Sequence, residues 1–196
     1  MLQNLLFQVV ITIEDINDNA PVFPSSVSQI SFSEGSRPGS RVLLDAALDS
    51  DDGENSRIAK YDIQSGNENN KFRLSVSNNP DSDASYLHLE TTSALDREER
   101  SSYLLNITAS DAGSPTLTGS MLLTINVLDI NDNAPEFVNS EYTARVNESL
   151  ATGSYVLQVS ARDRDQGDNS RVSYFLSSTG DSDQFNIDED TGKSCN

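Results

Sequence analysis

The sequence of 196 residues has few of the side chains on which most catalytic and metal-binding chemistry relies: one cysteine, one histidine and no tryptophan. Its single cysteine, Cys195, cannot form an internal disulfide, and a tetrahedral zinc site needs several cysteine or histidine ligands. With His88 as the only histidine, few schemes of nucleophilic catalysis remain. A folded extracellular chain without disulfides needs another source of stabilisation, and a metal bound through oxygen can supply it.

Positive charge is also scarce, because 13 lysine and arginine residues stand against 31 acidic ones and give a net charge of −18. Electrostatic binding to nucleic acid or to an anionic membrane needs clustered lysine and arginine, so both are excluded. Regular alternation of apolar and polar residues excludes a fully disordered acidic chain. The excess of carboxylates therefore indicates a folded protein that holds cations. Ca²⁺ is the cation best suited to carboxylate and amide ligands.

Long hydrophobic runs are missing as well, since no stretch has the roughly 20 apolar residues of a membrane-spanning helix. Residues 1–13 are apolar but have neither a basic start nor a small-residue cleavage site. Within them Phe7, Val9, Ile11 and Ile13 occur at every second position, which predicts a strand with one buried face. We expect any signal peptide and membrane anchor of the parent protein to lie outside this chain.

The strongest signal is an internal repeat with a period of 114 residues. The heptapeptide Asp-Ile-Asn-Asp-Asn-Ala-Pro occupies residues 15–21 and recurs at 129–135. At the same offset Glu34 matches Glu148, and the acidic loop 49–57 matches the loop 163–171. Such self-similarity is typical of a tandem array. We predict the last strand of a preceding repeat at 1–14, linkers at 15–20 and 129–134, a complete repeat at 21–128 and a truncated second repeat at 135–196.

The complete repeat shows seven short alternating runs, which are separated by clusters of Gly, Pro, Asn, Asp and Ser. The runs are residues 30–32, 42–46, 58–63, 72–76, 86–90, 102–109 and 120–127. Seven strands at this spacing predict an all-β fold, an antiparallel β-sandwich of immunoglobulin-like size, and no long amphipathic helix is evident.

The second linker concentrates oxygen ligands in five residues. Asp129, Asn131, Asp132 and Asn133 offer side-chain oxygens, and Ile130 can offer its backbone carbonyl. The proline that follows favours an extended chain, and five extended residues span about 16 Å, enough for several ions. An EF-hand is excluded, because the loops that begin at residues 49 and 163 have Glu54 and Asp168 where that motif needs glycine.

These motifs resemble the repeats of the cadherin family, in its protocadherin-like or Fat-like part. Asp-x-Asn-Asp-Asn-Ala-Pro-x-Phe lies at 15–23 and 129–137, Leu-Asp-Arg-Glu at 95–98, Ala-x-Asp-x-Gly at 109–113, and Asp-x-Asp at 49–51 and 163–165. The resemblance implies tandem Greek-key β-sandwiches joined by calcium-binding linkers. It further implies calcium-dependent, often homophilic, adhesion to other cadherin ectodomains at the extracellular face of the plasma membrane.

The resemblance also implies a set of Ca²⁺ ligands at each linker, two well-formed sites at the second linker and one at the first. At the second linker the outermost ion takes Glu34, Asp96, Glu98 and Asp132, and the second ion takes Glu34, Glu98, Asp129, Ile130 (backbone), Asp132 and Asp165. The third ion takes Asn131, Asn133 (backbone), Asp163, Asp165 and Asn169 (backbone). We expect this third site to be incomplete, because it also needs the Ala-x-Asp-x-Gly aspartate of the following repeat. For the first linker one ion takes Asn17, Asn19, Asp49, Asp51, Asn55 and Asp111, and Asp15 and Asp18 have fewer partners.

The sequence also suggests one glycosylation site and leaves two alternative functions open. The sequon at Asn106 predicts glycosylation, because Asn106 lies on the opposite face of its strand from Leu105 and Ile107. A hydrolase that uses Asp96 and Glu98 as an acid–base pair is a weaker alternative, since metal binding explains both residues better. A calcium-dependent glycan-binding β-sandwich is another alternative, although such a site usually needs aromatic platforms and the chain has no tryptophan.

Overall fold

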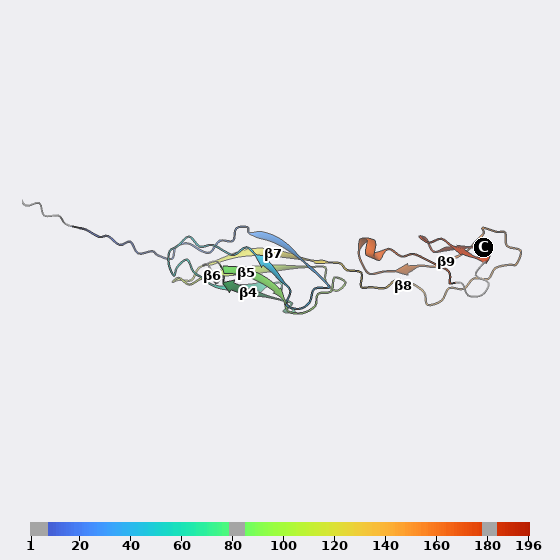
Figure 1. Ribbon diagram of the computed structural model, residues 1–196, viewed down its shortest axis with the longest axis horizontal. Coiled ribbons are helices and arrows are strands. Elements are labelled where there is room, and N and C mark those ends of the chain that lie inside the picture. The colour runs from blue at the N-terminus through green and yellow to red at the C-terminus, as the bar shows by residue number, and fades with distance from the viewer. Residues whose placement is uncertain (1–7, 79–84, 178–183) are drawn as a thin grey trace, which may run out of the picture. The chain divides into compact units, whose positions relative to one another are not determined.

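The computed structural model describes residues 8–78, 85–177 and 184–196 (Figure 1). Contacts divide the chain into two compact units. The first unit comprises the chain up to Leu95 together with Arg100–Val127, and the second comprises Asp96–Glu99 together with Leu128–Asn196. The short segment 96–99 therefore makes its main contacts with the second linker and the residues after it.

The first unit contains the seven expected strands, each within three residues of its predicted bounds. They are β1 (Val27–Ser33), β2 (Arg41–Leu44), β3 (Ile58–Ser65), β4 (Phe72–Asn78), β5 (Ser85–Thr91), β6 (Ser102–Asp111) and β7 (Thr118–Leu128). They form a four-stranded sheet in the order β1-β7-β6-β3 and a three-stranded sheet in the order β2-β5-β4. The chain passes repeatedly from one sheet to the other, as in a Greek-key sandwich, so the predicted fold class is confirmed.

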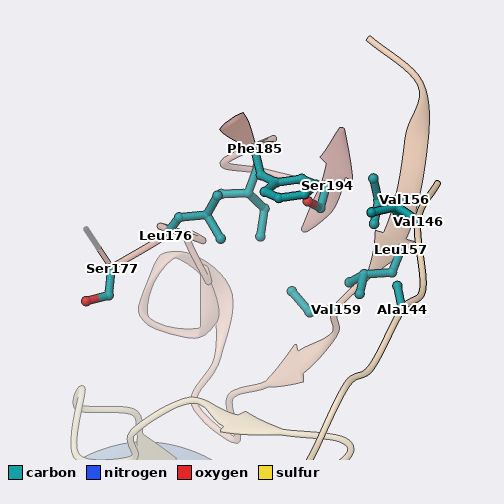
Figure 2. A pocket seen from close by; sticks show the side chains of 10 residues that line it. Ala144, Val146, Val156, Leu157, Val159, Leu176, Ser177, Phe185 and Ser194 are labelled. Atoms are coloured by element: carbon teal, nitrogen blue, oxygen red, sulfur yellow. The ribbon is translucent and has the colours of Figure 1, made fainter. Parts of the chain in front are cut away.

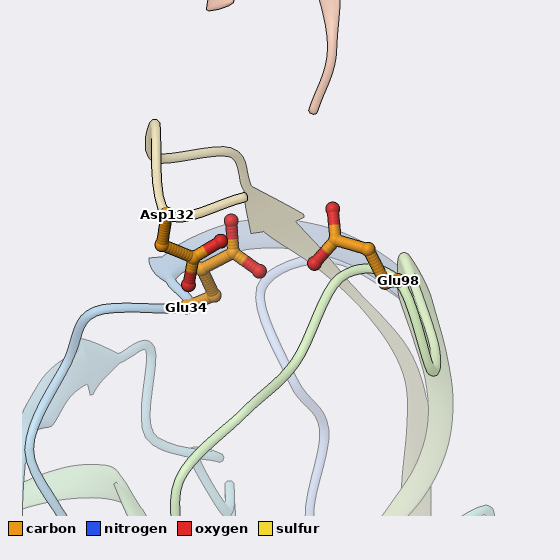
Figure 3. A group of neighbouring side chains, drawn as sticks. All are labelled: Glu34, Glu98 and Asp132. Atoms are coloured by element: carbon orange, nitrogen blue, oxygen red, sulfur yellow. The ribbon is translucent and has the colours of Figure 1, made fainter. Parts of the chain in front are cut away.

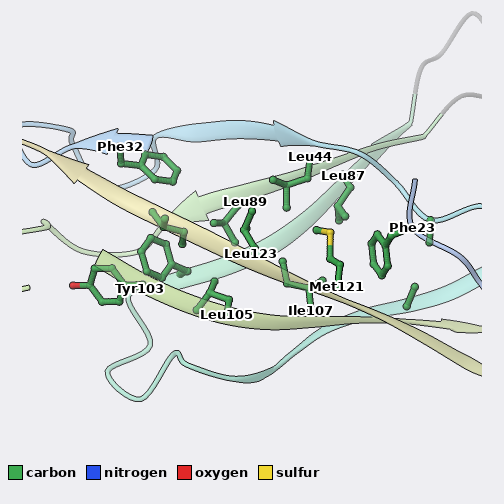
Figure 4. Close-up of a cluster of buried hydrophobic side chains, with 14 of the residues drawn as sticks. Phe23, Phe32, Leu44, Leu87, Leu89, Tyr103, Leu105, Ile107, Met121 and Leu123 are labelled. Carbon is green, nitrogen blue, oxygen red and sulfur yellow. The ribbon is translucent and has the colours of Figure 1, made fainter. Parts of the chain in front are cut away.

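Alternating side chains of the two sheets form the hydrophobic core between them (Figure 4). On β6 the residues Tyr103, Leu105, Ile107 and Ala109 are buried, and on β7 every second residue from Met121 to Val127 is buried. Leu87 and Leu89 of β5 contribute from the other sheet. Asn106 lies on the outer side of β6, as the alternation predicts.

The second unit contains shorter elements. They are β8 (Glu136–Phe137), β9 (Tyr155–Gln158), β10 (Ala161–Arg162), the 3₁₀ helix η1 (Gly167–Ser170), β11 (Asn186–Ile187) and β12 (Lys193–Cys195). β8 pairs with β10, and β12 pairs with both β9 and β11. Among the described residues, no helix is long and apolar enough to span a membrane.

An apolar cavity of about 290 Å³ lies within the second unit, lined by residues that include Val146, Val156, Leu157 and Phe185 (Figure 2). Phe185 occupies the repeat position of Phe72, which in the first unit is buried and packs edge-on against Tyr103 of β6. The described part of the second unit has no counterpart of β6 or β7. Its core residues therefore keep an open apolar side.

The strand expected near the N-terminus is not formed over residues 8–14. Phe7 lies outside the described residues, but Val9, Ile11 and Ile13 are 80–91% exposed. A strand needs a neighbouring strand to satisfy its backbone groups and to cover its apolar face. The described residues provide no such neighbour for this segment, and its assignment to a preceding repeat stays a prediction.

The sequence did not predict a buried carboxylate on the smaller sheet that pairs with two half-exposed arginines. Glu90 of β5 is 4% exposed, although strand alternation alone gives no reason for a buried carboxylate there. It lies opposite Arg41 of β2 and Arg73 of β4, and both guanidinium groups bond to its carboxylate. The hydrogen bond from Arg73, assisted by the charge of Arg41, lowers the pKa of Glu90 despite the opposing effect of burial.

The lowered pKa of Glu90 predicts a pH-dependent contribution to the stability of the first unit. A carboxyl group with a depressed pKa in the folded state stabilises the fold above its unfolded pKa, about 4.3 for glutamate, and this contribution is lost as the pH falls further. Glu90→Gln should therefore speed hydrogen exchange of the β5 amides at pH 7, and the difference from the wild type should shrink at pH 3. Glu54→Gln is the control, because Glu54 pairs with Arg57 at an exposed position. An equal difference at both pH values would contradict the assignment.

Candidate metal sites

The first linker is held against the acidic loop of its own unit by hydrogen bonds to Asp51. The backbone amide of Asn19 donates to Oδ2 of Asp51 at 3.2 Å, and its side-chain amide donates to Oδ1 at 2.5 Å. The backbone amide of Asp51 in turn donates to Oδ1 of Asp49 at 3.0 Å. These bonds bring together Asn19, Asp49 and Asp51, which the family resemblance assigns to one calcium site.

Asp111, at the end of β6, brings a buried carboxylate to the same place. It is 1% exposed, and its oxygens accept bonds from the backbone amides of Gly113 and Leu117, each at 3.1 Å. The side-chain amide of Asn17 donates to its Oδ2 at 3.2 Å. Each of these donors is neutral. A buried carboxylate carries a large desolvation cost, which a cation offsets better than neutral amides do.

Two oxygen atoms of the residues assigned to this site are buried without a hydrogen-bond partner among the described residues. They are Oδ1 of Asn17 and Oδ2 of Asp49, and both belong to the predicted ligand set. Leaving a buried acceptor unsatisfied costs about 1–3 kcal/mol, so native structures rarely do so without a functional reason. Oxygen atoms that lack a donor suit a cation, and the residues around the first linker therefore fit Ca²⁺.

Gly113 leaves the space that Asn17 occupies. A Cβ atom built on Gly113 would lie 2.2 Å from Cγ of Asn17, well inside van der Waals contact. Any larger residue there would push the Asn17 side chain away from Asp111. The glycine of the Ala-x-Asp-x-Gly motif thus has a steric role in the site.

The second linker repeats the contacts of the first. The side-chain amide of Asn133 donates to Oδ1 of Asp165 at 2.7 Å, and the backbone amide of Asp165 donates to Oδ1 of Asp163 at 2.9 Å. The side chain of Asn169 donates to Oδ2 of Asp129 at 2.8 Å, and that of Asn55 donates to Oδ2 of Asp15 at 3.0 Å. Asp15, for which the sequence predicted fewer partners, is thus bonded to its loop.

Three carboxylates of the second unit gather beside this linker. Glu98, Asp129 and Asp165 each offer one oxygen within 4.8 Å of the others. Burial would raise the pKa of Asp129, but hydrogen bonds from the side chain of Asn169, the backbone of Gln166 and the guanidinium of Arg97 outweigh it and lower that pKa. The Asp129 carboxylate is therefore held in its charged form, which can bind a cation.

Glu34, Glu98 and Asp132 lie on three separate segments (Figure 3). Glu34 follows β1 directly and is buried, Glu98 belongs to the Leu-Asp-Arg-Glu motif, and Asp132 belongs to the second linker. Within the second unit, Glu98 and Asp132 also offer oxygens within 4.8 Å of each other.

Three of the expected ligands lack a comparable arrangement of neighbouring ligand oxygens in the part of the chain that the structure describes. Oδ1 of Asp96 accepts the backbone amide of Glu99 at 3.0 Å, and Asp96 is not among the grouped carboxylates of the described residues. Oδ1 of Asp18 accepts the side-chain amide of Asn19 at 2.8 Å. The side chain of Asn131 is exposed. Their assignments as ligands remain predictions.

Arg97 is the functional-site residue to which the sequence-based interpretation gave no role. Its Nε donates to Oδ1 of Asp129 at 2.5 Å, and its guanidinium also bonds to Glu98. The signal was present in the sequence, because Arg97 stands between two acidic residues of a motif that was assigned to metal binding.

Comparison with known proteins agrees with these features. The family model for the cadherin domain matches residues 28–128 and 142–193. The chain is 42% identical to Protocadherin Fat 4 of Mus musculus over 186 residues, which cover 94% of this chain and 4% of that protein. It is 40% identical to Protocadherin alpha-6 of Homo sapiens over 191 residues, which cover 96% of this chain and 20% of that protein.

Solved structures of extracellular cadherin domains are similar as well. Domains 1–5 of Protocadherin Gamma B2 give a TM-score of 0.86 at 37% identity, covering 93% of this chain and 34% of that chain. Domains 1–4 of Protocadherin Gamma B7 give a TM-score of 0.83 at 40% identity, and the match covers 93% of this chain and 43% of that chain. The chain thus spans only a small part of the length of the curated relatives that it matches. It belongs to the cadherin family, whose members are adhesion proteins and not enzymes.

Proposed function

We propose that both linkers bind Ca²⁺ and that the bound ions stiffen successive repeats of an extracellular adhesion module. The observation that carries this proposal is the pair of buried oxygens, one on Asn17 and one on Asp49, that have no hydrogen-bond partner among the described residues, together with the buried carboxylate of Asp111, to which Asn17 bonds. A second support is the recurrence of the same linker-to-loop hydrogen bonds 114 residues later.

The chemistry of the ligands favours calcium over other ions. All proposed side-chain ligands are carboxylates or amides, which are hard oxygen donors, and each set gathers four to six residues. Mg²⁺ prefers a smaller octahedral site and retains its water. Zn²⁺ generally uses histidine or cysteine, and this chain has one of each.

The proposed ligand sets remain those that the resemblance implies, with two ions at the second linker and one at the first. In this scheme Glu34, Asp96 and Glu98 act with the linker residues 129–133 and the Asp163–Asp165 loop. Bound ions would limit the conformations of the linker, and mass action would stabilise the ion-bound geometry. Without cations, carboxylates at contact distance repel one another by about 1–4 kcal/mol per pair, depending on the local dielectric constant.

The adhesive part of the proposal rests on family membership. We infer that the parent protein presents these repeats outside the cell at the plasma membrane, with its anchor elsewhere, and that other cadherin ectodomains, including further copies of the same protein, are its partners. Glycosylation of Asn106 fits this location, because Asn106 lies on the outer side of β6.

Limited proteolysis with trypsin tests the stiffening of the second linker. Cleavage after Arg97, Arg162 and Arg164 should be at least tenfold slower in millimolar Ca²⁺ than in excess chelator, because ion binding restrains the segments that carry them. Millimolar Mg²⁺ is the control and should protect little. Equal cleavage in Ca²⁺ and in chelator would contradict an ion-stiffened joint in this chain.

Asp111→Asn tests the site at the first linker. The substitution keeps the shape of the side chain and removes its charge, so calcium affinity at this site should fall about tenfold or more. Calcium-dependent hydrogen exchange of residues 15–20 measures that affinity, and residues 128–134 report the second linker in the same sample. Asp45→Asn, at an exposed position outside the predicted ligand set, is the matched control. Unchanged exchange of residues 15–20 would exclude Asp111 as a ligand.

Bead aggregation tests the homophilic adhesion. Beads coated with this chain should aggregate in Ca²⁺ and disperse in chelator, and Asp111→Asn should raise the calcium concentration that is required. Dispersed beads in the presence of calcium-loaded chain would contradict a homophilic surface on these repeats, while leaving calcium binding intact.

A further inference from the structure

We propose that Arg97 is a built-in counter-ion of the second linker, which pairs with the calcium ligands when calcium is absent and which calcium must displace. Arg97 would then set the calcium concentration at which this linker stiffens. The inference rests on the proposed calcium binding and adds to it a residue that opposes the ion.

The first argument is the geometry of the Arg97 guanidinium within the second unit. Nε donates to Oδ1 of Asp129 at 2.5 Å, and a terminal nitrogen bonds to Oε1 of Glu98. The same terminal nitrogen donates to the backbone carbonyl of Arg164 at 2.7 Å. One cation thus bridges the loop 96–99, the linker and the loop after β10, which are segments that calcium is proposed to join.

The second argument is burial. The Arg97 side chain is 13% exposed, and its carboxylate partners Asp129 and Glu98 are 11% and 18% exposed. Charge pairs shielded from water attract more strongly than surface pairs, which are largely screened. Arg97 is therefore placed to neutralise these carboxylates, and removing it would leave charge that only another cation could balance.

The third argument is competition for the same oxygens. Asp129 and Glu98 are two of the three carboxylates whose oxygens gather within 4.8 Å in the second unit. A divalent cation bound by them would meet the positive charge of Arg97 at close range. Calcium binding should therefore require the guanidinium to withdraw, and this requirement weakens the affinity for calcium.

The first linker supplies an internal comparison. Oδ2 of Asp15 accepts bonds from the backbone of Asp52 and the side chain of Asn55, as Oδ2 of Asp129 does from Gln166 and Asn169. Among the described residues these donors to Asp15 are neutral amides, and no arginine is among them. Changing Arg97 should thus alter the second linker alone.

The test compares the unsubstituted chain with its Arg97→Gln variant by hydrogen exchange over a calcium titration. The midpoint for residues 128–134 should shift to about tenfold lower Ca²⁺ in the variant, while the midpoint for residues 15–20 stays the same. In chelator, residues 128–134 of the variant should exchange faster than in the wild type. Arg100→Gln is the matched control, because Arg100 bonds to Ser102 and Glu68 and lies over the Tyr103 ring.

The possible outcomes separate this inference from the proposed function. An unchanged or weaker calcium midpoint in Arg97→Gln, with calcium binding intact in the wild type, would overturn the counter-ion role alone and assign Arg97 to support of the loaded site. Absence of any calcium response in the wild type would overturn both. A shift to lower calcium together with faster exchange in chelator supports the inference.

Discussion

The cost of holding many carboxylates close together is the constraint on which the rest of this chain depends. Asp111 is buried among neutral donors, and Glu98, Asp129 and Asp165 gather within 4.8 Å of one another. Hydrophobic packing cannot offset that charge, because burial makes each unpaired carboxylate more costly. Cations or arginine must balance these groups.

The two linkers show how a short sequence reproduces one local geometry. In each copy an asparagine of the linker bonds to the second aspartate of the Asp-x-Asp loop, and the first linker aspartate bonds to an asparagine further along that loop. The glycine of each loop has a positive φ of 62°, a conformation that glycine adopts at little cost. Local sequence therefore determines most of this arrangement.

Arginine plays two parts that depend on its surroundings. On the smaller sheet, Arg41 and Arg73 enclose Glu90 and stabilise the fold, whereas Arg97 binds carboxylates that we assign to calcium. Neither pairing follows from the spacing of residues along the chain, since Arg97 and Asp129 are 32 residues apart. Both arise because folding brings distant strands and loops together.

Strand periodicity and the spacing of turn residues were enough to predict the seven strands and the sandwich, because each depends on local pattern, whereas the ligand assignments at the linkers stay predictions. Three features depended on the tertiary structure. Residues 8–14 alternate like a strand but have no neighbour with which to pair in the part of the chain that the structure describes. Oδ1 of Asn17 and Oδ2 of Asp49 are buried without a donor among the described residues, which only the folded arrangement of the linker and its loops decides. Arg97 becomes a counter-ion because the motif 96–99 packs with the second linker, and long-range packing of that kind cannot be read from sequence spacing.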